Sequence, residues 1–157
     1  MSLVTEHLQR HDKPFEVLPH PPAMNSIDEA RVIGIGAEDV IKTVVLDTEA
    51  GHALAVLPAV ERLDLKLAQR AVHDHRAHLA SEDEMSRDFP DFDLGAVPPL
   101  GSLLGIPTYV DPEVMTHETV VFAGSQRESV KIRTAALFDD EAVTVVPLAL
   151  HPDYDDV

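Results

Sequence analysis

The sequence contains no cysteine and no tryptophan among its 157 residues, and its basic residues are few. The absence of cysteine excludes disulfides, thiolate metal sites and a cysteine nucleophile, and it is compatible with a reducing compartment. Acidic residues outnumber basic ones by 28 to 12, which gives a formal net charge of −16. This charge argues against broad binding to DNA or along an RNA groove, because neutralising phosphates supplies most of that affinity. We expect the acidic residues to form a solvated surface.

Long apolar runs are also absent, and no segment approaches the roughly 20 residues needed to cross a bilayer. Residues 1–13 lack the order of charged, apolar and small residues that marks a secretory signal. We therefore expect no membrane association and a cytoplasmic location. A chain of this size can bury roughly 70% of its unfolded surface in one core. Residues 1–157 are thus expected to form a single domain, either as a monomer or as a homodimer.

Hydrophobic periodicity predicts helices interleaved with strands and several hairpin-type connections. Helices are expected over residues 3–11, from residue 26 to Gly34 or Gly36, after Asp64, over 82–87 and over 135–138. Strands are expected over residues 15–18, 40–47, 52–58, 108–110, 119–123, 129–133 and 142–146. This order favours an α+β fold, with one mixed, curved β-sheet and flanking helices, over a doubly wound fold.

The helix near residue 26 has a clear start signal. Ser26 and Glu29 stand at the spacing of a capping box, in which each side chain accepts a hydrogen bond from the other's backbone. We expect this helix to bury Ile27, Ala30 and Ile33.

The stretch 95–101 reads Gly-Ala-Val-Pro-Pro-Leu-Gly and predicts a stiff loop. Pro98 and Pro99 fix φ and remove two backbone donors. Gly95 and Gly101 can adopt positive φ or allow close approach to the backbone. We expect exposed carbonyl groups that could form one wall of a binding site for a small polar group.

Lys42 is a single charge in the apolar run 40–46 and is a candidate for the opposite wall of that site. Because strand side chains alternate, Lys42 shares a face with Val40, Val44 and Leu46. Two interpretations follow. The ammonium can extend past the end of the strand to water, or it can reach a pocket and meet an anion or carbonyl groups there.

His73, His75 and His78 are close in sequence, but their spacing matches no standard zinc site. We interpret them as part of a solvated helix end. The sequence also lacks the GxSxG and HExxH motifs of two hydrolase classes. No metal and no cofactor are expected.

Several stretches match one known pattern when they are taken together and in order. They are His20-Pro21 followed by residues 26–30, Lys42 within residues 39–45, residues 63–68, residues 95–101, and Ala123-Gly124-Ser125. The stretch 95–101 fits a GxxxPxG motif, with Gly95, Pro99 and Gly101 at its signature positions. From about residue 15 to 147 the sequence thus resembles the YbaK/prolyl-tRNA synthetase-associated domain family.

This resemblance implies a trans-editing deacylase that hydrolyses the ester of mischarged aminoacyl-tRNA and contacts the 3′ end of the tRNA. It implies catalytic roles for Lys42 and Gly101 and no protein nucleophile. It implies substrate-binding roles for a wider set: His20, Gly95, Pro98, Pro99, Gly101, Gly124 and Ser125.

Two departures from the family pattern concern substrate choice. Residues 89–94 are acidic and aromatic where many members carry Thr-Gly, and the turn 125–128 is less basic than in other members. The alternative function is a non-catalytic binding module of the same fold that recognises an amino acid or a partner protein. A metal hydrolase built on the histidine cluster is a third hypothesis.

Overall fold

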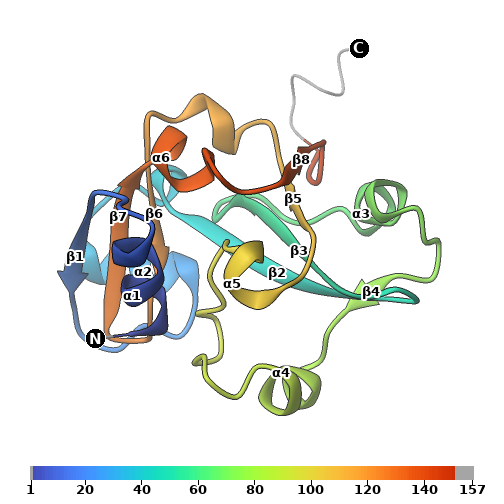
Figure 1. Cartoon of the computed structure of the whole chain (residues 1–157), viewed down its shortest axis with the longest axis horizontal. Helices are drawn as coiled ribbons and strands as arrows, with labels where there is room; N and C mark the ends of the chain where they lie inside the picture. The colour runs from blue at the N-terminus through green and yellow to red at the C-terminus, as the bar shows by residue number, and fades with distance from the viewer. Residues whose placement is uncertain (1, 151–157) are drawn as a thin grey trace.

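The structure is a computed structural model that describes residues 2–150, and its strands form two sheets. The smaller sheet is antiparallel and has the order β1 (Phe15–Pro19), β7 (Glu128–Arg133), β6 (Thr119–Ala123). The larger sheet has the order β4 (His78–Leu79), β2 (Ile41–Thr48), β3 (Gly51–Pro58), β5 (Thr108–Val110), β8 (Val143–Val145). The two sheets lie beside each other in Figure 1.

The larger sheet is mixed. Strand β2 pairs with β3 and β4 in antiparallel fashion, whereas β5 runs parallel to β3 and to β8. A single parallel bridge between Val40 and Val121 connects the two sheets. The predicted α+β fold with mixed strands and flanking helices is therefore confirmed, with the strands divided over two sheets.

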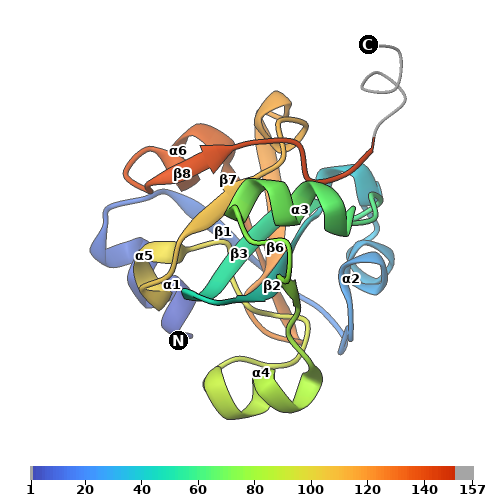
Figure 2. The ribbon, with the colours of Figure 1, turned by 90° about the vertical axis from the view of Figure 1, so that its right-hand side faces the viewer.

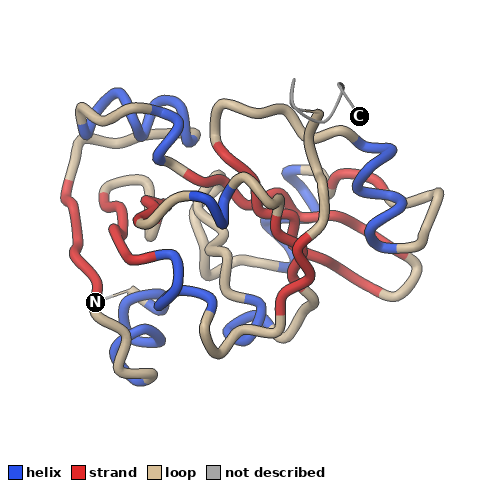
Figure 3. The backbone as a smooth tube through the Cα atoms, turned by 90° about the horizontal axis from the view of Figure 1, so that it is seen from above, coloured by secondary structure: helices blue, strands red, loops and turns tan. Residues whose placement is uncertain are grey.

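Short helices surround the strands, as Figures 2 and 3 show. They are α1 (Leu3–Arg10), α2 (Ser26–Ile33), α3 (Leu65–Val72), α4 (Glu82–Asp88), α5 (Gly101–Leu104), α6 (Thr134–Phe138), and the 3₁₀ turns η1 (Ala37–Asp39) and η2 (Val114–Thr116). Within residues 2–150, no helix has the length and apolar character needed to cross a membrane. Strand β4 and helix α5 were not predicted, because elements of two and four residues are too short to show a period.

The β2–β3 hairpin is covered on both faces, as the apolar runs predict. On one face, Ile41 and Val56 join the largest core cluster. On the other face, Leu46 and Ala55 pack with Ala68 of α3. The hairpin therefore forms the centre of the domain, and each face supports a different set of elements.

Helix α2 differs from its prediction at its start. The Asn25 side chain, and not that of Ser26, accepts the capping hydrogen bond, from the Asp28 backbone N–H at 2.8 Å. Of the side chains expected to be buried, Ala30 is buried and Ile33 packs against the core, but Ile27 is 51% exposed, whereas Glu29 is 2% exposed. The predicted Ser26–Glu29 capping box is wrong, because Asn25 is the cap and Ser26 is the first residue of the helix.

Helix α3 starts as predicted, since the Asp64 carboxylate accepts a hydrogen bond from the Leu67 N–H at 3.0 Å. It ends at Val72, and His73 follows with φ of 55°. The next residues leave the helix, and His78 lies in β4. The three histidines thus do not share a helix end.

Replacing the cap distinguishes the two readings of α2. Asn25→Ala should lower the free energy of unfolding by about 1 kcal/mol, because one backbone donor of the first turn loses its acceptor. Ser26→Ala should change it by less than about 0.5 kcal/mol. Urea unfolding followed by circular dichroism measures both. An equal or larger loss in Ser26→Ala would contradict the assigned cap.

Candidate active site

Three segments that the sequence singled out converge at one end of the smaller sheet. The His20 N–H donates to the Arg127 carbonyl at 2.9 Å, and the Ala23 N–H donates to the Gln126 carbonyl at 2.7 Å. The Gln126 N–H in turn donates to the Asp93 carboxylate at 2.9 Å. These bonds join the segment 20–25, the β6–β7 turn and the chain that leads into Gly95.

Gly95 is exposed and has φ of +80°, a conformation that favours glycine. A Cβ atom on it would lie 2.7 Å from the Met24 carbonyl oxygen. Both the positive φ and the close contact with Met24 require glycine at this position. The expected conformational role of Gly95 is therefore confirmed. The close approach fixes the start of the loop against the segment before α2.

Lys42 lies on β2 opposite Leu57 of β3 and is partly buried. The bridge between Val40 and Val121 fixes its surroundings further. The start of β2 therefore lies beside β6, the strand that precedes the turn with the predicted residues Gly124 and Ser125.

Burial lowers the pKa of Lys42 below its ordinary value, and the positive charge of Arg62 adds to this effect. The negative charge of Glu61 acts in the opposite direction and favours the ammonium. An ammonium with part of its hydration removed interacts more strongly with an incoming anion than a fully solvated one. Partial burial fits both interpretations of Lys42, the one in which it reaches water and the one in which it meets a ligand.

The interior of the loop does not match its expected exposure. Residues 96–100, including Pro98 and Pro99, are buried. Val97 packs with Val45, and Leu100 packs with Ile41. The expectation of exposed carbonyl groups along the loop is wrong, because the apolar side chains between the glycines fill the core.

The loop and Lys42 also lie on different faces of β2. Val45 and Ile41, which the loop contacts, alternate with Lys42 along the strand, so their side chains point the other way. The buried half of the loop therefore supports β2 from behind. Only its first residue, Gly95, reaches the region where His20, Gly124 and Ser125 gather.

Gly101 begins α5 and is buried. A Cβ atom there would lie 2.2 Å from the Thr108 hydroxyl and 2.5 Å from the Ile106 carbonyl oxygen. Its backbone is not in the positive-φ region. The start of α5 packs closely against the residues just before β5 and at its start. This packing by itself explains why residue 101 is a glycine.

A buried hydrogen-bonded chain links α2 to the candidate site. The Ser129 hydroxyl, on β7, bonds to the Glu29 carboxyl, and His20 Nε2 lies 2.9 Å from the same hydroxyl. The other ring nitrogen, His20 Nδ1, lies 2.7 Å from the Pro21 carbonyl oxygen. Sequence reasoning identified His20 but missed Glu29 and Ser129, because nothing in their spacing distinguishes them from other polar residues.

Burial raises the pKa of Glu29 to about 7, and the hydrogen bond to Ser129 opposes that rise. The Ser129 hydroxyl donates to the Glu29 carboxyl, and its oxygen faces His20 Nε2, while His20 Nδ1 faces the Pro21 carbonyl oxygen. This chain holds the His20 ring in one orientation beside the converging segments.

A cleft of about 500 Å³ lies nearby, on the side of the smaller sheet that faces the end of α2. None of the residues predicted from the sequence lines it. Its lining residues are Glu16, Leu18, Ile33, Ile35, Asp39, His117, Glu118, Thr119, Val121 and Lys131.

Comparison with known proteins gives a consistent result. A family model described as an aminoacyl-tRNA editing domain matches residues 20–139. A crystal structure of a candidate trans-editing enzyme for prolyl-tRNA synthetase is 24% identical, with 95% of this chain and 96% of that chain covered and a TM-score of 0.81. A hypothetical protein, APE2540, is 19% identical, with 95% and 100% covered and a TM-score of 0.85. These two structures share the fold.

Two glycines of the predicted site allow a matched test of packing. Gly101→Ala should lower the free energy of unfolding by about 1–3 kcal/mol, because its Cβ would overlap Thr108 and Ile106. Gly124→Ala should be tolerated, since the nearest atom to its Cβ would be 3.5 Å away. Thermal unfolding measures both variants. Equal stability of the two would contradict the packing role of Gly101.

The raised pKa of Glu29 predicts a pH dependence of stability. Because its folded pKa lies above the unfolded value of 4.5, the folded state holds the proton more tightly. Its contribution is complete below about pH 4.5 and is lost as the pH rises through about 7. From pH 5 to 8, the wild type should lose roughly 2–3 kcal/mol relative to Glu29→Gln, which keeps the hydrogen bonds and cannot ionise.

Urea unfolding at several pH values gives this difference. Glu118→Gln, at an exposed position, serves as the control and should follow the wild type. A Glu29→Gln variant whose stability changes with pH in parallel with the wild type would show that Glu29 ionises normally.

Proposed function

Because the chain belongs to the aminoacyl-tRNA editing domain family, we propose that it hydrolyses the ester bond of mischarged aminoacyl-tRNA. Water attacks the ester carbonyl carbon, the ribose oxygen leaves with a proton, and the products are free amino acid and uncharged tRNA. The family match supports this reaction, and the observation that carries the assignment of the site is the partly buried lysine at the start of β2, where the chain bridges to β6.

Lys42 has the electrostatic role in this proposal. Its ammonium neutralises a phosphate at the 3′ end of the tRNA or polarises the ester carbonyl. Partial burial strengthens either interaction, because less water competes for the charge. The acidic surface elsewhere on the chain restricts tRNA contact to this local region.

The converging segments hold the aminoacyl end. Gly95, Gly124 and Ser125 lie on these segments, and we assign them to substrate binding, since two of the three are glycines that allow close approach to the backbone. His20, which is held by hydrogen bonds through Ser129 to Glu29, is a polar contact at the same edge. An aminoacyl ester is already activated, so orientation and a few fixed dipoles supply much of the acceleration without a protein nucleophile.

The roles of Pro98, Pro99 and Gly101 are indirect in this proposal. They are buried behind β2 and fix the path of the chain between Gly95 and α5. They thereby define where the exposed start of the loop lies. We therefore assign them the role of positioning Gly95.

Deacylation assays test the assignment of Lys42. Lys42→Ala should reduce the rate of ester loss from a sensitive mischarged tRNA by about 100-fold or more, because one charge interaction in the transition state disappears. Lys66→Ala, at an exposed position on α3, should keep the wild-type rate. Both variants are compared by circular dichroism first. A folded Lys42→Ala variant with full activity would overturn the role of Lys42.

The net charge of −16 favours one alternative, a binding module that recognises an amino acid or a partner protein. The same panel of mischarged tRNAs separates the two. Ester loss above the spontaneous rate for at least one tRNA supports the deacylase. No loss for any tRNA, together with saturable binding of a free amino acid, supports the binding module.

A further inference from the structure

Three side chains form a row across adjacent strands at the far end of the hairpin from Lys42. Asp47 of β2 is the register partner of His52 of β3 on one side and of His78 of β4 on the other. Register partners in antiparallel strands point to the same face. His52, Asp47 and His78 therefore stand side by side on one face of the sheet, in the order of the strands.

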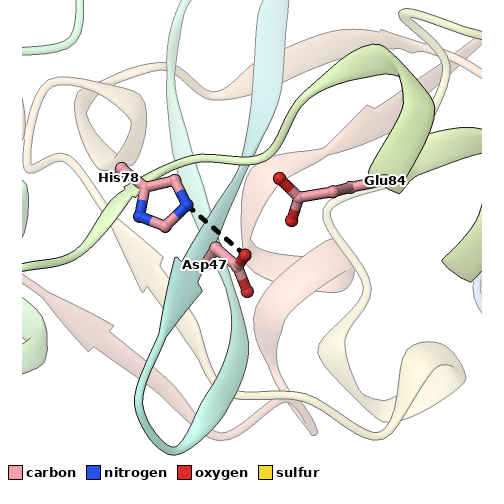
Figure 4. Close-up of side chains that lie close together, drawn as sticks. All are labelled: Asp47, His78 and Glu84. Atoms are coloured by element: carbon pink, nitrogen blue, oxygen red, sulfur yellow. Dashed lines mark ion pairs between the residues drawn. The ribbon is translucent and has the colours of Figure 1, made fainter.

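Helix α4 adds two carboxylates to this row. Glu84 and Asp88 are four residues apart and so lie on the same side of the helix. One ligand atom each from Asp47, His78 and Glu84 lies within 4.8 Å of the others, and Figure 4 shows the three side chains pointing toward one another. His52 Nε2 lies 2.9 Å from an Asp88 carboxylate oxygen.

The outer hydrogen bonds of the two histidines fix which ring nitrogens face Asp47. In the neutral rings, His52 Nε2–H donates to Asp88 and His78 Nδ1–H donates to the Arg76 carbonyl at 3.3 Å. The remaining nitrogens, His52 Nδ1 and His78 Nε2, then carry lone pairs. They lie 3.6 and 3.4 Å from the two carboxylate oxygens of Asp47.

His52 Nδ1 is buried and has no hydrogen-bond partner among the described residues. A buried ring nitrogen next to a carboxylate is satisfied either by a proton directed to Asp47 or by a cation between the two. A ligating histidine characteristically donates its other N–H to a carboxylate or carbonyl, as His78 does to Arg76. One imidazole nitrogen and two carboxylates are ligands that zinc and similar transition ions accept.

We propose that Asp47, His78 and Glu84 bind a divalent transition-metal ion such as Zn²⁺, with His52 on the other side of Asp47. The ion ties α4 to β2 and β4. Helix α4 leads into the segment that ends at Gly95, so the ion fixes the approach to the candidate active site. Lys42 is five residues from Asp47 along β2, about 17 Å at the usual rise of a strand. The ion is thus structural, and the proposal is independent of the deacylase function.

Calorimetric titration of the chelator-treated full chain with Zn²⁺ tests the site. The wild type should bind one ion per chain, and His78→Ala and Glu84→Gln should each weaken binding by at least about tenfold. His75→Ala and Glu82→Gln are matched controls from the same segments, exposed and outside the cluster, and should bind as the wild type does. Zn²⁺ should raise the melting temperature of the wild type and both controls, because it binds the folded state.

His78 is exposed, so its replacement leaves the fold intact, and circular dichroism checks this. Millimolar Mg²⁺ should not displace Zn²⁺, since imidazole nitrogen is a poor ligand for Mg²⁺. The proposal is overturned if the wild type shows no saturable Zn²⁺ binding with a Kd below the order of 100 μM. It is also overturned if His78→Ala and Glu84→Gln both bind Zn²⁺ with the wild-type affinity, or if Mg²⁺ displaces Zn²⁺ and binds with equal affinity.

Discussion

The burial of both faces of the β2–β3 hairpin is the constraint on which the rest of the molecule depends. Successive side chains of β2 point to opposite faces of the sheet, and each face packs against a different set of residues. The loop with Val97 and Leu100 fills one side, and α3 fills the other. Because no water-exposed face remains in the middle of the hairpin, polar groups on it are confined to its two ends.

Those two ends carry the two proposed sites. At the start of β2, Lys42 is partly buried. At the end of β2, Asp47 stands between two histidines under α4. The same alternation that makes the hairpin a core element thus separates a cationic site from an anionic one.

Local patterns were sufficient for most elements. Continuous apolar runs predicted β2 and β3, the Asp64 cap predicted the start of α3, and the glycines at 34 and 36 predicted the end of α2, which falls at Gly34. The cap of α2 was misplaced by one residue, and the expected burial of Ile27 was wrong. Asn25 and Ser26 are both good caps, so local propensity could not separate them.

The sequence by itself determined the composition of the core, the family pattern and the presence of a lysine on an apolar strand face. Only the tertiary structure decided which residues share a site. It separated Lys42 from the interior of the 95–101 loop, joined His20 to Glu29, and removed His78 from the other histidines to place it beside Asp47. The physical reason is that strand register and helix placement depend on contacts between segments that are distant in the sequence. The periodicity of apolar residues shows only which face of each segment is apolar.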